Sequence, residues 1–441
     1  MRQAGMESAL EANETASHSP RKRKEKPVNR VLIYCHDTFG LGNVRRMMAI
    51  AKHLVDCDPD TSVLVVSGSP MLHAFRIPPR VDYVKLPCLA RTVQGEYKVK
   101  YLDMTYDKIV RLRSNLILST VLDFDPAVII VDKKPFGVSN ELAPALELLR
   151  RRNRHPGMVL LLRDILDHPD TTTPVWRKNG YFDAVSEFYD QVLVVGSRDI
   201  FETGKEYDFP PDARRKLRYC GYLRRERSKF DRETLRAHLG VGKERLVLVT
   251  AGGGEDGYRV LASYLAGLRK SPPGENVKSL LVCGPEMAKG QHQSICADAA
   301  SLPNVSVIEF SDDMMGLMDA ADLVVSMSGY NTVCELLTLK KRAILVPRVR
   351  PVLEQWIRAE RLARLGLMRS IHPDALTPEG LMGAVVEELG RTNVQDSRFY
   401  KIDLDGLARV GKAVGELLRE QDLRIPLELA RPAVELAQSA V

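Results

Sequence analysis

The sequence lacks any C-x-x-C pair, although 7 cysteines are scattered along its 441 residues. Closely spaced cysteine pairs are typical of disulfide frameworks, redox centres and zinc sites. Most of these cysteines stand in apolar segments, where a free thiol behaves as a small hydrophobic side chain. We therefore expect no disulfide scaffold and no zinc site, and a reducing compartment fits this pattern.

Long hydrophobic runs are missing as well. No run of about 18 apolar residues occurs, and the N-terminal stretch has no apolar segment like that of a secretory signal. The sequence therefore predicts a cytoplasmic protein without a transmembrane segment. The formal net charge is +7, and part of it lies in the basic run 21–26. We interpret residues 1–27 as a disordered basic leader rather than a nucleic-acid-binding arm, while peripheral contact with anionic lipid stays open.

What the sequence does have is a regular alternation of apolar strand patterns and amphipathic helix patterns. In the first half, strands are expected at 31–35, 62–66, 81–86, 127–131, 158–162 and 191–195, with helices at 43–54, 106–122 and 140–152. In the second half, strands are expected at 246–250, 279–282, 305–308, 323–325 and 343–346, with a closing helix at 404–418. This alternation is typical of an α/β protein with mostly parallel sheets.

The pattern divides the chain into two α/β halves. We expect a Rossmann-like domain over residues 28–222, a second one over 223–400, a terminal helix at 401–422 and a tail at 423–441. The polar, basic stretch 221–229 is the expected interdomain linker. Two such domains facing across a cleft would bind a ligand at the carboxyl ends of their strands.

The segment 326–337 carries the clearest functional pattern. A buried strand leads into Ser328-Gly329-Tyr330-Asn331-Thr332, which opens a helix and so gathers free backbone N–H groups and a positive dipole end, as a phosphate requires. Glu335 falls on the same helix face one turn later, where its carboxylate can accept hydrogen bonds from a ribose diol. Glu354 and Gln355 follow a second short strand. This order predicts a nucleotide-sugar site.

These motifs resemble the donor-binding domain of GT-B glycosyltransferases, closest in pattern to the UDP-N-acetylglucosamine transferases that form lipid II and to a related family of predicted bacterial glycosyltransferases. The resemblance runs from about Val28 to Leu418. It implies the GT-B fold, with two Rossmann-like domains facing across a cleft, and a UDP-sugar as co-substrate without any cofactor. It also implies the following sugar-donor contacts: Gly253, Gly254, Phe310, Ser311, Ser328, Gly329, Tyr330, Asn331, Thr332, Glu335, Arg348, Arg350, Glu354 and Gln355. For Phe310 and Ser311, a plain strand exit capped by Asp312 is an open alternative.

The glycine-rich turn of the first half argues against a dehydrogenase. Gly40 and Gly42 begin a dinucleotide-binding pattern, but Arg45 replaces its third glycine, and no carboxylate follows the second strand at Ser67 to hold an NAD ribose. In the resembling family this turn shapes the acceptor side. A histidine common in those relatives aligns with Asn43 here, and an amide cannot accept a proton at neutral pH.

The general base is therefore left open. His36 and Asp37 lie on the same turn and are the candidate bases, together with an acceptor such as an amine that needs little deprotonation. A second polar cluster, Arg163, Asp164 and His168, follows a strand. These three side chains are expected either to meet acceptor or sugar hydroxyls or to form an interdomain salt-bridge network.

Two D-x-D strings, at 123–125 and 403–405, are the remaining candidates for metal chemistry. The first precedes a proline and a buried strand, and the second precedes the terminal helix, so both read as turn and cap residues. No catalytic metal is expected.

These patterns favour a metal-independent GT-B glycosyltransferase. It is expected to move a sugar, with N-acetylglucosamine or a related hexosamine as first guess, from UDP to a small-molecule or lipid acceptor with inversion. Two alternatives stay open: a sugar-nucleotide epimerase on the same scaffold, and a non-catalytic sugar-nucleotide binder, prompted by Asn43. The acceptor and the oligomeric state do not follow from the sequence.

Overall fold

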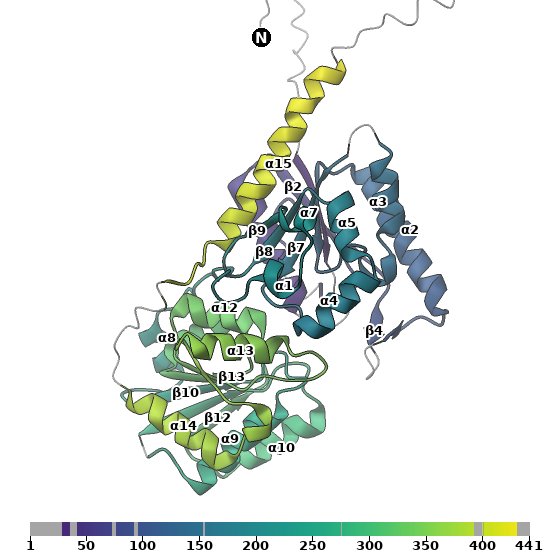
Figure 1. The fold of residues 1–441 in the computed structure, drawn as a ribbon. Helices are drawn as coiled ribbons and strands as arrows, with labels where there is room; N and C mark the ends of the chain where they lie inside the picture. Colours follow the sequence, from purple (N-terminus) through teal and green to yellow (C-terminus); the bar gives the residue numbers. More distant parts are fainter. Residues whose placement is uncertain are drawn as a thin grey trace, which may run out of the picture.

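The computed structural model describes residues 29–35, 42–72, 76–91, 96–152, 155–274, 276–391, 399 and 401–429. Two α/β units are visible, with the purple-to-teal first half above the green second half in Figure 1. Within these ranges, no helix has both the length and the apolar character needed to cross a membrane.

The first sheet is entirely parallel and has the strand order β3-β2-β1-β6-β7-β8-β9. Its central strands are buried on both faces because they are continuous apolar runs, as helix-covered parallel strands require. The strands are β1 (Asn29–Cys35), β2 (Thr61–Ser67), β3 (Val81–Lys85), β6 (Val128–Asp132), β7 (Gly157–Arg163), β8 (Gln191–Val195) and β9 (Leu217–Tyr219). A separate antiparallel pair consists of β4 (Leu89–Arg91) and β5 (Tyr97–Val99).

The helices of the first half follow the strands that they cover. Helix α1 buries Val44, Met47, Ala51 and Leu54, which recur at helical spacing on one face. The helices are α1 (Gly42–Cys57), α2 (Tyr106–Phe124), α3 (Ala143–Arg150), α4 (Pro169–Lys178), α5 (Tyr181–Phe188), α6 (Thr203–Glu206) and α7 (Pro211–Arg214), with a short 3₁₀ turn at Val138–Asn140.

The second sheet is parallel too, with the order β12-β11-β10-β13-β14-β15. Its strands are β10 (Arg245–Thr250), β11 (Val277–Val282), β12 (Val305–Ile308), β13 (Leu323–Ser326), β14 (Ala343–Leu345) and β15 (Arg369–Ser370). Its helices are α8 (Arg232–His238), α9 (Tyr258–Lys270), α10 (Lys289–Ala300), α11 (Met314–Ala320), α12 (Tyr330–Leu339), α13 (Glu354–Arg364) and α14 (Pro378–Gly390), with a 3₁₀ turn at Pro373–Ala375. Both sheets confirm the predicted parallel α/β architecture.

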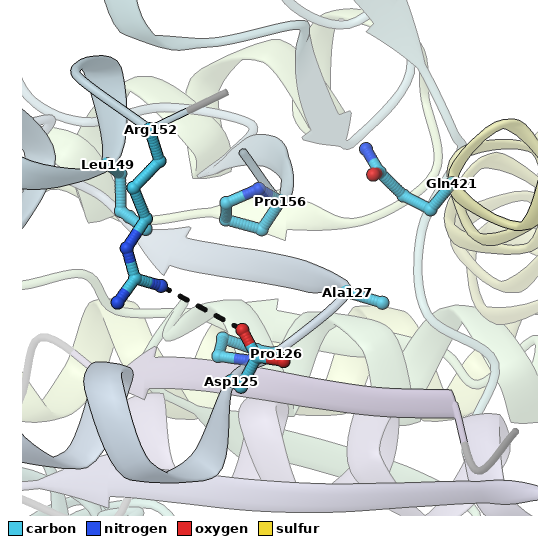
Figure 2. Close-up of a pocket in the computed structure, with 7 residues that line it drawn as sticks. All are labelled: Asp125, Pro126, Ala127, Leu149, Arg152, Pro156 and Gln421. Carbon is cyan, nitrogen blue, oxygen red and sulfur yellow. Dashed lines mark ion pairs between the residues drawn. The ribbon is translucent and has the colours of Figure 1, made fainter. Parts of the chain in front are cut away.

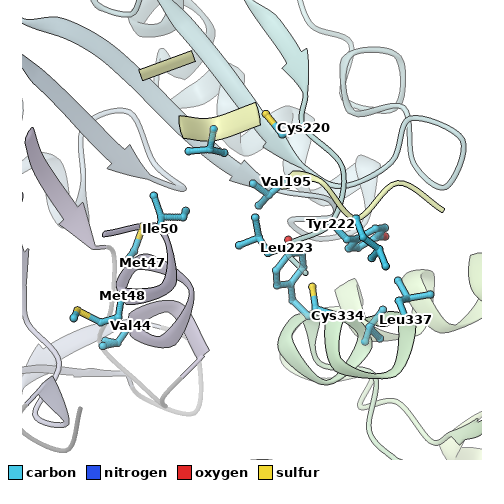
Figure 3. Packing of buried hydrophobic residues seen from close by; sticks show 14 of the residues in the cluster. Val44, Met47, Met48, Ile50, Val195, Cys220, Tyr222, Leu223, Cys334 and Leu337 are labelled. Carbon is cyan, nitrogen blue, oxygen red and sulfur yellow. The ribbon is translucent and has the colours of Figure 1, made fainter. Parts of the chain in front are cut away.

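The expected linker is not a solvated connection. Tyr222 and Leu223 are fully buried, and Arg225 is 8% exposed. Figure 3 shows Leu223 between the first-half helix α1 and Cys334 of α12, and Tyr222 beside α12, within one hydrophobic cluster that draws residues from both halves. The stretch 221–229 does lie between the last strand of the first sheet and the first helix of the second half, but its charged residues conceal the buried apolar pair Tyr222 and Leu223 in the sequence pattern.

Helix α15 (Gly406–Leu429) closes the described chain and lies along the first half in Figure 1. It contacts α1, β6 and β7, and it buries Val410, Val414 and Leu417. Gly406 is required at its start because a Cβ there would come within 2.7 Å of the carbonyl oxygens of Gly221 and Tyr222. The helix extends further at its C-terminal end than the predicted 404–418.

A small pocket lies at the opposite end of the first sheet from the carboxyl ends of its strands (Figure 2). Asp125, Pro126 and Ala127 line it just before β6, and Pro156 lines it just before β7. Arg152 forms an ion pair with Asp125 at 3.8 Å across it. This position is the amino-terminal edge of the sheet, which is not where parallel α/β sheets bind their ligands.

Candidate active site

The turn from β13 into α12 has the form predicted for a phosphate site. Gly329 is the N-cap of α12 and no side chain caps the helix, so the first-turn N–H groups are not taken by a capping residue. Ser328 is buried and donates its hydroxyl hydrogen to the backbone oxygen of Gln355 at 2.7 Å. Gly329, Asn331 and Thr332 are half-buried. The turn is therefore anchored on one side and presents its backbone on the other.

Glu335 lies one turn into α12, where its side chain is only 3% exposed. Its Oε1 atom is 2.7 Å from Nη1 of Arg45, which belongs to α1 of the first half. The contact is an ion pair without the alignment of a hydrogen bond. The candidate ribose carboxylate is thus held by a cation from the other domain.

Glu354 is buried beneath three guanidinium groups. Its distances to them are 2.8 Å for Arg358, 3.4 Å for Arg163 and 3.7 Å for Arg348. Burial would raise the pKa of Glu354, but the three cations outweigh burial and lower it to about 2. For the cation Arg163 burial acts in the opposite direction, and it lowers the pKa of the guanidinium. Glu354 is therefore ionised at neutral pH, and its nearest partners are protein side chains.

Asp164 and Arg358 form a bidentate ion pair between the two halves. Both carboxylate oxygens of Asp164 accept hydrogen bonds of 2.8 Å from Arg358, and Tyr222 donates a third at 2.9 Å. Arg358 also donates to the backbone oxygen of Ser328 at 2.8 Å, directly before the α12 turn. Arg163 and Asp164 were expected either to meet acceptor or sugar hydroxyls or to form an interdomain salt-bridge network. The structure shows the salt-bridge network. His168 instead caps α4 by accepting a hydrogen bond from the Asp170 N–H.

The loop before α13 contributes Arg348, Arg350 and Gln355. Gln355 accepts a hydrogen bond from the backbone N–H of Arg348 at 3.3 Å through its side-chain oxygen. Arg348 also pairs at 2.9 Å with Asp256, which lies in the turn between β10 and α9 of the second half. Arg350 is exposed. The two arginines expected among the sugar-donor contacts thus differ, since Arg348 is paired with neighbouring carboxylates and Arg350 is exposed.

Packing within the chain requires glycine at some positions of the 250–258 turn and not at others. A Cβ on Gly254, which has a φ of +102°, would lie 2.7 Å from the backbone oxygen of Cys283. A Cβ on Gly253 would lie 2.8 Å from Glu286, whereas one on Gly252 would meet nothing within 4 Å. Glycine therefore allows the loop after β10 to lie close against the loop after β11.

Phe310 and Ser311 follow β12 at the same edge of the second sheet. Phe310 is 56% exposed, and Ser311 accepts a hydrogen bond from the Asp313 N–H at 3.1 Å. Asp313 caps α11 through the N–H of Gly316. The cap residue is therefore Asp313, and Asp312 as the alternative assignment was wrong by one position.

Tyr330 and Asn331 face the first half. Tyr330 is buried and stacks on Tyr222 with ring centroids 5.9 Å apart. Asn331 donates to the backbone oxygen of Gly42 at 2.9 Å and accepts a hydrogen bond from Arg225. These two predicted sugar-donor residues contribute to the contact between the domains.

In the first-half turn, the predicted residues His36, Asp37 and Gly40 lie outside the described residues. Gly42 begins α1, and Asn43 accepts a hydrogen bond from Arg46 at 3.1 Å. Sequence reasoning missed Arg46 and Asp132, a buried ion pair of 2.7 Å at the carboxyl end of β6. Burial would lower the pKa of Arg46, but Asp132 outweighs burial and raises it. The sequence signal that could have revealed this pair is Asp132, an acidic residue at the end of an otherwise apolar strand.

Among the residues that the structure describes, no group of three or more histidine, cysteine, aspartate or glutamate side chains is arranged to hold a metal ion. The two D-x-D strings contribute turn contacts. Asp125 ends α2 in the left-handed conformation, and Asp403 accepts a hydrogen bond from the Asp405 N–H at 3.0 Å.

Comparison with known proteins matches the second half to a known domain family. Residues 246–398 match the glycosyltransferase family 28 C-terminal domain. The UDP-N-acetylglucosamine–N-acetylmuramyl-(pentapeptide) pyrophosphoryl-undecaprenol N-acetylglucosamine transferase of Acetivibrio thermocellus is 25% identical over 82% of this chain and 95% of its own. The enzyme of the same name from Glaesserella parasuis is 32% identical over 26% of this chain, a match that spans only 33% of that relative.

Solved structures agree on the fold. MurG of Acinetobacter baumannii superposes with a TM-score of 0.58 at 14% identity, covering 88% of this chain and 99% of its own. The glycotransferase of kitacinnamycin gives a TM-score of 0.58 at 16% identity, covering 91% and 99%. Together the fold, the domain match and the relatives define a GT-B glycosyltransferase. Within that class, the chain resembles the enzymes that form lipid II.

Proposed function

We propose that this protein transfers a sugar from a UDP-sugar to a small-molecule or lipid acceptor, with inversion at the anomeric carbon and without a metal ion. The observation that carries the proposal is the uncapped start of α12 with Glu335 one turn behind it, inside the region that matches the family 28 domain. N-acetylglucosamine or a related hexosamine is the proposed sugar, because the curated relatives are named as N-acetylglucosamine transferases.

In this mechanism the acceptor attacks the anomeric carbon from the side of the first domain. The bond to the diphosphate breaks, and the negative charge that develops on the leaving group is stabilised by the N–H groups and dipole at the start of α12. Exposed Arg350 adds a cation on the same side. Glu335 holds the ribose, and His36 or Asp37 takes the acceptor proton.

The test is incubation with UDP-N-acetylglucosamine, with and without a panel of acceptors, followed by mass spectrometry of sugar and nucleotide products. Glycosylated acceptor together with released UDP is the expected result, and its rate should survive excess EDTA. An epimerised UDP-sugar formed without acceptor would favour the epimerase. Tight UDP-sugar binding with no turnover would favour the non-catalytic binder. Activity abolished by EDTA and restored by Mg²⁺ or Mn²⁺ would overturn metal independence.

A further inference from the structure

Arg45 forms an ion pair with Glu335, the carboxylate that binds the ribose in the proposed function. Its Nη1 atom lies 2.7 Å from Oε1 of Glu335, and the arginine comes from the first turn of α1 in the opposite domain. The helix starts are joined beside this pair, because Asn331 of α12 donates to the backbone oxygen of Gly42 at 2.9 Å. Arg45 therefore reaches the site whenever the two helix starts are together.

Arg45 is the partner of this ion pair that a ligand can displace. Arg45 is 39% exposed, whereas Glu335 is 3% exposed, so the arginine covers a carboxylate that is otherwise buried. The contact lacks hydrogen-bond alignment, and water screens the pair at its arginine end, which weakens the attraction. The neighbouring Arg46 differs, since it is buried and hydrogen-bonded to Asp132 at 2.7 Å.

We propose that Arg45 is a competitor for the nucleotide's ribose: it neutralises Glu335 in the empty enzyme and must withdraw before the ribose hydroxyls can bind. This rests on the proposed function, because it requires Glu335 to be the ribose ligand. A buried carboxylate without a partner is unfavourable, so the arginine keeps the empty site stable at the cost of affinity. Arg45 thereby sets how tightly the enzyme holds its nucleotide.

Uridine is the discriminating probe, because it has the ribose but no phosphate charge that loss of an arginine would affect. Binding is measured by NMR titration for wild type, Arg45→Ala, Glu335→Ala and the double variant. The matched control is Arg269→Ala, which removes an arginine of similar exposure, 41%, from a 2.9 Å ion pair with Asp298.

Arg45→Ala should bind uridine roughly three- to tenfold more tightly, and Arg45→Lys should fall between that variant and the wild type. The control should match the wild type. In the Glu335→Ala background, removal of Arg45 should bring no gain, because no carboxylate remains to compete for. If Glu335→Ala does not fold, Glu335→Gln takes its place.

The possible failures are distinguishable. Unchanged or weaker uridine binding by Arg45→Ala, with binding lost in Glu335→Ala, would overturn the competition and leave the proposed site intact. Unchanged binding by a folded Glu335 variant would overturn the ribose role itself. If neither uridine nor UDP binds the wild type, the proposed nucleotide is wrong and the competition falls with it.

Discussion

At the scale of single residues, Glu354 shows how neighbours can change what a side chain does. The family resemblance implies that Glu354 contacts the sugar donor, but three arginines surround it. Two of the three, Arg348 and Arg358, lie close to it in sequence, whereas Arg163 comes from the other domain. The ionised form of Glu354 is therefore part of what stabilises the folded protein.

Replacing Glu354 with glutamine should lower stability at neutral pH by about 3 kcal/mol, the free energy that corresponds to a pKa lowered from 4.5 to about 2. Because the folded pKa is the lower one, this stabilisation is present above pH 4.5 and is lost as the pH falls towards 2. Urea unfolding at about pH 7 and about pH 3.5 should show a smaller pH dependence for Glu354→Gln than for the wild type.

Glu360→Gln is the matched control, since it removes a carboxylate from a surface pair with Arg364 on the same helix. It should change stability by less than about 1 kcal/mol. The same pH dependence in Glu354→Gln and the wild type would show that the arginines do not hold this carboxylate ionised.

The candidate site was predictable from sequence where one element supplies the pattern. The strand, glycine turn and helix of 326–337 are contiguous, so the uncapped helix start and the place of Glu335 follow from local rules. The ion-pair partners of Glu335 and Asp164 could not be predicted from the sequence. Arg45 and Arg358 lie far away in the chain, and no periodicity or spacing links residues that meet only across a domain contact.

At the scale of elements, the strand boundaries depended on length. The strands 191–195 and 305–308 were predicted at their observed bounds, because apolar runs of that length stand out. Strands β9 and β15 were missed because their residues, Leu-Arg-Tyr and Arg-Ser, are not apolar runs, unlike the equally short β14. Their parallel pairing with β8 and β14 defines them instead.

The glycine-rich turn after β10 gives an element-scale prediction. Gly254→Ala should destabilise the protein by about 2–4 kcal/mol, because a Cβ would press on the loop after β11 from an unfavourable φ of +102°. Gly252→Ala is the control, with a φ of +65° and nothing within 4 Å of its Cβ. It should cost only about 1–2 kcal/mol. Equal losses in thermal unfolding would contradict the interlocking of the two loops.

At the scale of the whole molecule, the contact between the halves is a buried polar network beside a shared hydrophobic cluster. Asp164 is 1% exposed and Arg358 is 0% exposed, so removal of either charge leaves the other without water to solvate it. The same arginine binds the Ser328 carbonyl. Domain contact and the shape of the α12 turn are therefore coupled through one side chain.

Asp164→Ala should lower the free energy of unfolding by about 3–5 kcal/mol and should also weaken UDP binding, because Arg358 loses its fixed position below the α12 turn. Isothermal titration calorimetry and denaturant unfolding measure the two effects. Asp170→Ala, which removes a 92% exposed carboxylate near His168, is the control and should leave both unchanged. Full UDP affinity in a destabilised Asp164→Ala protein would separate domain contact from the turn.

The position of α15 has a consequence for biosynthesis. Its buried face, with Val410 and Val414, covers strands of the first half that end at Arg163. On the ribosome, at about 5–20 residues per second, the roughly 250 intervening residues take on the order of 10–50 seconds to appear. During that time the second domain can form while the first still exposes an apolar strip. The first half is thus completed only after the second half has been translated, and until then its exposed apolar surface is open to aggregation.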